Sequence, residues 1–104
     1  MTGELSDEVL RALRRIIRAT VAYSHRLASE FGLTVPQLVV LREIAARGEA
    51  SGSDLARAVS VSPATMTGIL KRLRERGLVE RRRSRQDRRR ILESLTDEGR
   101  DILA

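Results

Sequence analysis

The chain has 104 residues with a formal net charge of +6, and 41% of the residues are hydrophobic but only 2% are aromatic. This length allows one hydrophobic core and excludes the large cofactor-binding folds, while the absence of cysteine excludes disulfides and thiol-based redox sensing. Leucine, isoleucine, valine, alanine and methionine must therefore build the core, which favours a mostly helical domain.

The first predicted element is a long amphipathic helix from Asp7 to about Phe31, in which apolar residues recur near helical spacing. Its apolar stripe is wider than packing on one small domain requires, and a second subunit would explain the surplus. We expect residues 1–33 to form this dimerisation helix. The candidate residues facing the partner are Leu10, Leu13, Ile17 and Tyr23.

A second helix is predicted to follow the segment Thr34 to Gln37, which has the Thr-x-x-Gln form of a capping box. We expect it to run to about Arg47, with Gly48 as the terminating residue. Its expected core face consists of Leu38, Leu41, Ile44 and Ala45.

Two further helix starts come shortly afterwards. Ser51 to Asp54 offers a serine cap with an acidic residue three positions later, which predicts a short helix through Val59. Ser62 and Pro63 are a serine cap followed by proline at the first helical position, and they predict a fourth helix that runs to Arg76. The tight turn between these two helices indicates a helix-turn-helix.

A change of periodicity follows the fourth helix. Residues 78–83 and 89–95 are short, contain apolar residues that favour strands, and flank a polar tip at 84–88, so we predict a β-hairpin. The alternation is imperfect, because Glu93 shares a strand face with two apolar residues. We expect a winged helix-turn-helix over residues 34–95 and the start of a shortened C-terminal helix over 96–104. The fold class is mainly α with a small β-hairpin (α+β).

Basic residues are concentrated in the second half of the chain. Within residues 71–90, eleven basic residues stand against three acidic ones, which is the electrostatic footprint expected for a polyanion partner. A solvated basic surface or a disordered basic tail is the alternative, and the excess of arginine is also compatible with a GC-rich genome. Apolar residues interrupt the run, which places it in folded elements.

The fourth predicted helix has an outward face that suits the major groove of DNA. Met66, Ile69, Leu70 and Leu73 are spaced to pack inward. The candidate DNA-facing residues are Pro63, Ala64, Thr67, Gly68 and Lys71, with Ser62, Thr65 and Arg72 beside them. An ordinary solvent-exposed helix is the alternative, but such a helix would carry Glu–Lys pairs rather than this nearly charge-free first half.

The predicted hairpin is the second contact element, because a two-stranded tip can place arginine in the minor groove while its stems hold phosphates. The candidate arginines are Arg83, Arg85, Arg88 and Arg89. Asp87 lies among them, and it either orients one arginine through a charge-assisted pair or simply dilutes the charge of an exposed loop.

Six short motifs follow one another over about residues 30–100. They are Leu33-Thr34-x-x-Gln37, Ser53-Asp54-Leu55-Ala56, Val61-Ser62 leading into Thr67, Arg76-Gly77-Leu78-Val79-Glu80-Arg81, Asp87-Arg88-Arg89 and Leu95-Thr96-x-Glu98-Gly99. In order and spacing they resemble the MarR family of winged helix-turn-helix transcription regulators. The resemblance implies that Asp87 and Arg89 are a wing pair with Arg89 in the minor groove. It also implies that the major groove or its phosphates are contacted by Ser62, Thr65, Thr67 and Lys71.

The same resemblance implies a homodimer on a pseudo-palindromic double-stranded DNA operator, repression of transcription, and a response to a small aromatic or anionic ligand. The chain departs from the family at Gly68, where many relatives carry a larger polar or basic side chain. It also ends at Ala104, where relatives continue into long C-terminal helices. We therefore expect a homodimer weaker than that of the longer relatives.

Two alternatives to a DNA-binding regulator are compatible with the sequence. A shortened paralogue that acts as an interaction module by pairing with a longer relative, or a protein that binds structured RNA, would share most of these features. An enzyme is not expected, because no carboxylate pair, nucleophile–base arrangement or glycine-rich phosphate loop occurs. His25 is the single histidine, so we assign no metal and no cofactor. Without a bilayer-length apolar stretch or a secretory signal pattern, we expect a cytoplasmic protein with no membrane partner.

Overall fold

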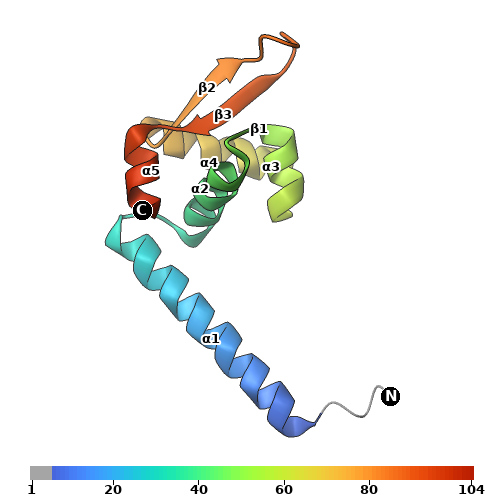
Figure 1. Ribbon diagram of the computed structural model, residues 1–104, viewed down its shortest axis with the longest axis vertical. Helices are drawn as coiled ribbons and strands as arrows, with labels where there is room; N and C mark the ends of the chain where they lie inside the picture. Colours follow the sequence, from blue (N-terminus) through green and yellow to red (C-terminus); the bar gives the residue numbers. More distant parts are fainter. Residues whose placement is uncertain (1–5) are drawn as a thin grey trace. The chain divides into compact units, whose positions relative to one another are not determined.

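The computed structural model describes residues 6–104, which form two units (Figure 1). One unit ends at Thr34 and holds helix α1 (Asp7–Glu30); the other runs from Val35 to Ala104. The first five residues of the predicted segment 1–33 lie outside the described residues. No helix within 6–104 is long and apolar enough to cross a membrane.

Helix α1 is delimited at both ends by local sequence. The Ser6 hydroxyl oxygen accepts a hydrogen bond from the backbone N–H of Val9 at 3.2 Å, and two acidic residues in the first turn favour the positive end of the helix dipole. At the other end Gly32 adopts a φ of +68°, a left-handed conformation that ends helices. The prediction of one long N-terminal helix is confirmed.

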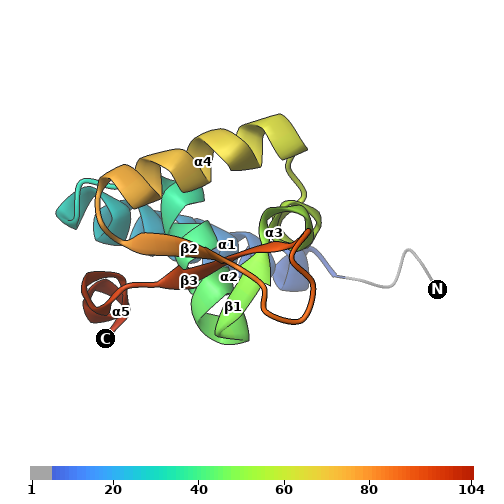
Figure 2. The ribbon, with the colours of Figure 1, turned by 90° about the horizontal axis from the view of Figure 1, so that it is seen from above.

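Four helices and three strands make up the second unit. In chain order they are α2 (Val35–Arg47), β1 (Glu49–Ser51), α3 (Gly52–Val59), α4 (Pro63–Glu75), β2 (Val79–Arg83), β3 (Ile91–Leu95) and α5 (Asp97–Leu103). The strands pair antiparallel in the order β1-β3-β2. Figure 2 shows α4 alongside the β2–β3 hairpin, which it contacts through β2. The predicted class, mainly helical with a small sheet, is confirmed.

Helix α2 is central to the second unit, because it contacts α3, α4, α5, β1 and β3. Its buried residues are Leu38, Val40, Leu41 and Ile44. The expectation that Ala45 lies in the core was wrong: Ala45 is exposed, near the end of the helix where the chain turns at Gly48, and Val40 is buried instead. Contact with neighbours on several sides widens the buried face beyond the stripe that periodicity indicates.

The sheet differs from the predicted hairpin in two ways. Strand β1 was missed, because its three residues are too few to show an alternating pattern. The second hairpin strand begins at Ile91 rather than at residue 89, since the backbone N–H of Arg90 donates to the Asp87 carbonyl oxygen at 2.9 Å and keeps the preceding residues in the loop. The hairpin loop therefore spans residues 84–90.

Helices α3 and α4 form the predicted helix-turn-helix. Each begins with a serine whose hydroxyl oxygen accepts a backbone N–H three residues later, Ser51 from Asp54 and Ser62 from Thr65, both at 3.1 Å. Between the helices Ser60 takes the left-handed conformation with φ +59°, which turns the chain within a few residues. Local capping thus fixes both ends of the turn.

The base of the hairpin is held against α5. The Thr96 hydroxyl donates to the Gly77 carbonyl oxygen at 2.6 Å, while its oxygen accepts the backbone N–H of Gly99 at 3.1 Å. A Cβ at Gly99 would stand 2.2 Å from the Leu78 carbonyl oxygen, so this close approach requires glycine. Helix α5 is consequently part of the scaffold that carries the wing.

Candidate nucleic-acid interface

The outward face of α4 consists of small and hydroxyl-bearing residues followed by cations. All eight α4 candidates are exposed: Ser62, Pro63, Ala64, Thr65, Thr67, Gly68, Lys71 and Arg72. On the opposite side Met66, Leu70 and Leu73 are buried, whereas Ile69 is only half-buried. The helix is anchored by its core side, which leaves the other side accessible along its length.

Hydroxyl groups on this face are held by the helix itself. Ser62 donates its hydroxyl hydrogen to the Thr65 side-chain oxygen at 2.9 Å, and Thr67 donates to the Pro63 carbonyl oxygen at 2.9 Å. The Thr67 oxygen keeps acceptor capacity, and its methyl group is available for apolar contact with a base. These bonds reduce the rotamer freedom that binding would otherwise have to remove.

Hydrogen bonds also order the loop of the hairpin. Ser84, only 6% exposed, accepts the backbone N–H groups of Gln86 and Asp87, each at 3.2 Å. The Arg83 guanidinium donates to the Arg88 carbonyl oxygen at 2.6 Å. The sequence pattern predicts only a polar tip at Ser84, although a serine that begins a turn is a recognisable signal for this role.

Asp87 and Arg89 form a local pair within this loop. The Asp87 Oδ1 oxygen accepts both the backbone N–H of Arg89 at 3.1 Å and its Nε at 3.3 Å. The carboxylate therefore contacts Arg89 near the backbone, while 92% of the Arg89 side chain stays exposed. The terminal nitrogens of the guanidinium are left to project from the wing. Arg85 and Arg88 are exposed on the same loop.

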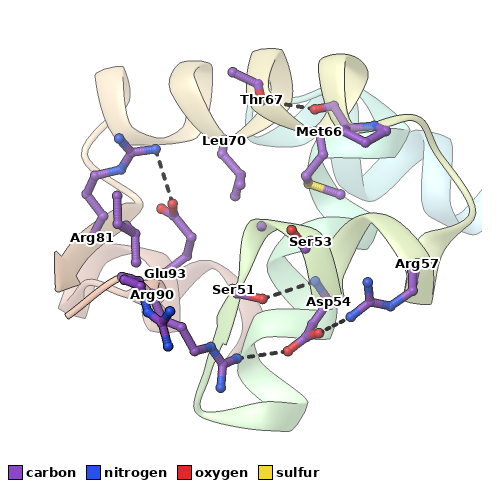
Figure 3. Close-up of a pocket in the computed structure, with 14 residues that line it drawn as sticks. Ser51, Ser53, Asp54, Arg57, Met66, Thr67, Leu70, Arg81, Arg90 and Glu93 are labelled. Carbon is purple, nitrogen blue, oxygen red and sulfur yellow. Dashed lines mark hydrogen bonds and ion pairs between the residues drawn. The ribbon is translucent and has the colours of Figure 1, made fainter. Parts of the chain in front are cut away.

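A hollow of about 630 Å³ lies between the helix-turn-helix and the wing (Figure 3). The Arg90 guanidinium bonds to Asp54 at 3.1 Å, and Asp54 also pairs with Arg57, so α3 and the wing loop are linked along one edge. Figure 3 shows this chain of charges and, across the hollow, Arg81 and Glu93. None of these five residues was among the sequence-predicted site residues.

Internal ion pairs reduce the predicted electrostatic footprint of residues 71–90. Acidic residues from outside that run engage at least four of its eleven basic residues: Arg74 and Arg81 pair with Glu93, Arg82 with Glu49, and Arg90 with Asp54. The Arg82–Glu49 contact is bidentate, at 2.7 and 3.2 Å. The sequence run therefore contains structural arginines as well as candidates for DNA contact.

Apolar side chains are exposed along α1. Leu13, Ile17 and Tyr23 have exposed fractions of 45%, 60% and 53%, whereas Leu10 is half-buried. Val9, Ile16 and Val21 are exposed as well and were not predicted to face a partner. Exposed apolar residues at this density on one helix are typical of a protein–protein contact surface. Within residues 6–104, no group of histidine and acidic residues has the arrangement of a metal site.

The helix-turn-helix of α3 and α4, followed by the β2–β3 hairpin, defines a winged helix-turn-helix domain. The family model described as "MarR family" matches residues 33–91, which is more than half of the chain. The chain belongs to the MarR family.

Two relatives illustrate the match. The chain is 31% identical over 100 residues to the HTH-type transcriptional repressor NicR of Pseudomonas putida, covering 96% of this chain and 63% of NicR. It is 35% identical over 101 residues to the transcriptional regulator HosA of Escherichia coli O157:H7, covering 96% of this chain and 73% of HosA. The chain thus spans less than two thirds of NicR.

Solved structures show the same fold. The transcriptional regulator Tm0710 of Thermotoga maritima superposes with a TM-score of 0.82 at 26% identity, covering 94% of this chain and 69% of that one. A mutant of MarR from E. coli, solved in complex with operator DNA, superposes with a TM-score of 0.70 at 30% identity, covering 88% and 68% of the two chains.

Proposed function

We propose that this protein is a transcription regulator that binds double-stranded DNA in a sequence-specific manner and represses transcription. The observation that carries the proposal is the joint placement, in one unit, of an accessible α4 face and an arginine-bearing wing. The MarR mutant of similar fold is bound to operator DNA, and NicR is named a repressor, which supports the same function here.

Helix α4 is proposed to lie in the major groove. The first half of its exposed face carries short side chains from Pro63 to Gly68, which permit close approach to base edges. Lys71 and Arg72 follow on the same exposed side, where they are suited to phosphate contacts that fix the register on the duplex.

The wing is proposed to insert Arg89 into the minor groove. A narrow minor groove has an enhanced negative potential that attracts arginine, and such a contact also responds to groove width. Because Asp87 holds the Nε side of Arg89 at 3.3 Å, the exposed end of the guanidinium is oriented before DNA arrives. Arg83, Arg85 and Arg88 would then neutralise phosphates on either side.

A second copy of the chain is proposed to complete the DNA-binding unit. A single module buries only roughly 600–1,000 Å² on DNA, so useful specificity normally requires two modules at fixed spacing. The exposed apolar residues of α1 offer the surface for pairing. The response to a small aromatic or anionic ligand and the cytoplasmic location stay predictions. The comparisons do not favour an interaction module, since relatives that match 96% of this chain are named repressor and regulator.

Selection from a pool of random duplexes, followed by competition binding, tests this function. We expect enrichment of a pseudo-palindromic sequence, and an affinity for it about 10³-fold or more above that for a scrambled duplex of equal length. A double-stranded RNA of the same sequence should compete no better than the scrambled DNA. Equal affinity for all duplexes would show that the protein binds DNA only through non-specific charge. Preference for the RNA would show that the protein binds RNA instead.

A further inference from the structure

Glu93 is a buried carboxylate on the core side of the wing. It lies in the middle of β3, opposite Ala50 of β1 and Arg81 of β2, and only 2% of its surface is exposed. Leu95, two residues along the same strand face, is buried in the core. A charge at such a position requires compensation, because burial removes its hydration.

Two arginines from different elements provide that compensation. Arg74, in the last turn of α4, places Nη1 at 3.1 Å from Oε1 of Glu93, and Arg81 of β2 places Nη2 at 3.4 Å from Oε2. Each carboxylate oxygen is thus bonded to a different element. The Glu93 carboxylate and its two arginines thus join the end of α4 to both strands of the wing. Helix α4 and the wing are the two elements that the proposed function brings to DNA.

Stability alone does not account for an acidic residue here. Replacing a buried ion pair by apolar residues of similar volume is often neutral or stabilising, and the strand face of Leu95 already packs in an apolar environment. Charge-assisted hydrogen bonds are directional, whereas apolar contacts are not. The feature that this group adds is therefore a defined geometry between α4 and the wing.

We propose that Glu93 is a positioning residue that fixes the orientation of α4 relative to the β2–β3 wing, so that both fit one DNA half-site. The inference rests on the proposed function. Two other ion pairs of the wing lead to different elements. Arg82 is paired with Glu49 of β1 and Arg90 with Asp54 of α3, and both of those carboxylates are considerably more exposed than that of Glu93.

The change in charge on removing Glu93 distinguishes a positioning role from a purely electrostatic one. Removing Glu93 raises the net charge by one and releases two arginines, so a purely electrostatic account predicts tighter binding to every duplex. A positioning role predicts weaker binding to the operator. If α4 and the wing are misaligned, only one of them can make its base contacts and those of the other are lost. Non-specific affinity should stay the same or rise.

The test compares Glu93→Leu and Glu93→Gln with a matched control, Glu49→Gln, which makes the same change in charge and frees Arg82 without touching α4. Thermal unfolding reports the fold, and competition binding gives the ratio of affinities for the selected operator and a scrambled duplex. We expect Glu93→Leu to stay folded but to unfold below the wild-type temperature, because Arg74, 22% exposed, loses its partner, while this ratio falls at least tenfold. Glu93→Gln should lower the ratio by a smaller factor, and Glu49→Gln should leave it unchanged.

Retention of the full ratio by a folded Glu93→Leu variant would overturn the inference. Should that variant fail to fold, Glu93→Gln, which conserves volume, decides the matter by the same ratio. An equal fall for Glu49→Gln would also overturn it, since charge would then be the cause. Absence of any specific binding by the wild-type protein would instead contradict the proposed function, so the two failures are distinguishable.

Discussion

The Asp87 carboxylate oxygen lies 3.3 Å from Nε of Arg89 and 3.1 Å from its backbone nitrogen, so one acidic residue fixes both the turn and the start of the arginine side chain. The pair is exposed, with 92% of the Arg89 side chain accessible. Its contribution to the stability of the fold is expected to be small, because exposed ion pairs are screened by water. The effect of the pair is to set the direction in which the Arg89 side chain projects from the wing.

Asp87→Ala should weaken operator binding by about 1 kcal/mol, although it removes a negative charge from a DNA-binding loop. The reason is that Arg89 loses its orientation and must be ordered on binding. Asp97→Ala is the matched control, because Asp97 is an exposed acid of α5 that pairs with Arg100. Fluorescence anisotropy with a labelled operator compares them; tighter binding by both variants would show that Asp87 acts only through its charge.

The salt dependence of DNA binding should reflect the internal ion pairs. If all eleven basic residues of 71–90 contacted phosphates, log K would fall against log salt with a slope of about −10 per module, at roughly −0.9 for each contact. At least four of them are paired with acids from outside the run, which leaves at most seven and limits the slope to no steeper than about −6. Binding titrations at several salt concentrations measure it. A flat response would argue against nucleic acid altogether.

Gly68→Ala should stabilise the isolated protein by about 0.5–1 kcal/mol, because glycine in a helix interior is entropically unfavourable. Nothing lies within 4 Å of a Cβ built at this position, so the methyl group meets no obstacle. Gly99→Ala should do the reverse, since its Cβ would stand 2.2 Å from the Leu78 carbonyl oxygen. Thermal unfolding of both variants checks the pair, and destabilisation by Gly68→Ala would indicate a conformation different from the one described.

Dimerisation should depend on the apolar residues of α1. We expect a homodimer that dissociates at about micromolar concentration, which corresponds to roughly 8 kcal/mol of association free energy. Ile17→Glu should shift it to monomer, because Ile17 is 60% exposed in the single chain and its replacement would bury a charge at the contact. Arg15→Gln makes the same change in net charge and should have little effect.

Sedimentation equilibrium over a wide concentration range measures this association. A wild-type protein that stays monomeric at high concentration would rule out the homodimer. Persistence of the dimer at nanomolar concentration would show that α1 and its surroundings associate more strongly than we predict.

Features governed by neighbouring residues were predictable from the sequence. The serine caps at Ser51 and Ser62 act on backbone groups three residues away, so the starts of α3 and α4 were predicted correctly. Features that depend on distant partners were not. The three residues of β1 become a strand only by pairing with β3, some forty residues later.

Glu93 illustrates the limit within the candidate site. Its place on an apolar strand face marked it as an exception to the alternation, but its partners lie 19 and 12 residues away, at Arg74 and Arg81. Nothing in the local pattern distinguishes these two arginines from their neighbours in the basic run. The division of that run into structural and DNA-facing residues therefore required the fold.

Chemical mapping of the selected operator tests the central claim most directly, because methylation distinguishes guanine N7 in the major groove from adenine N3 in the minor groove. We predict two protected major-groove patches centred about 10 base pairs or a multiple of that apart, each flanked by minor-groove protection. Arg89→Ala should weaken binding by about 1–3 kcal/mol and abolish only the minor-groove protection, whereas Arg11→Ala on α1 should change neither. Uniform protection of both grooves, or an unchanged pattern with Arg89→Ala, would contradict the assignment of α4 and the wing to separate grooves.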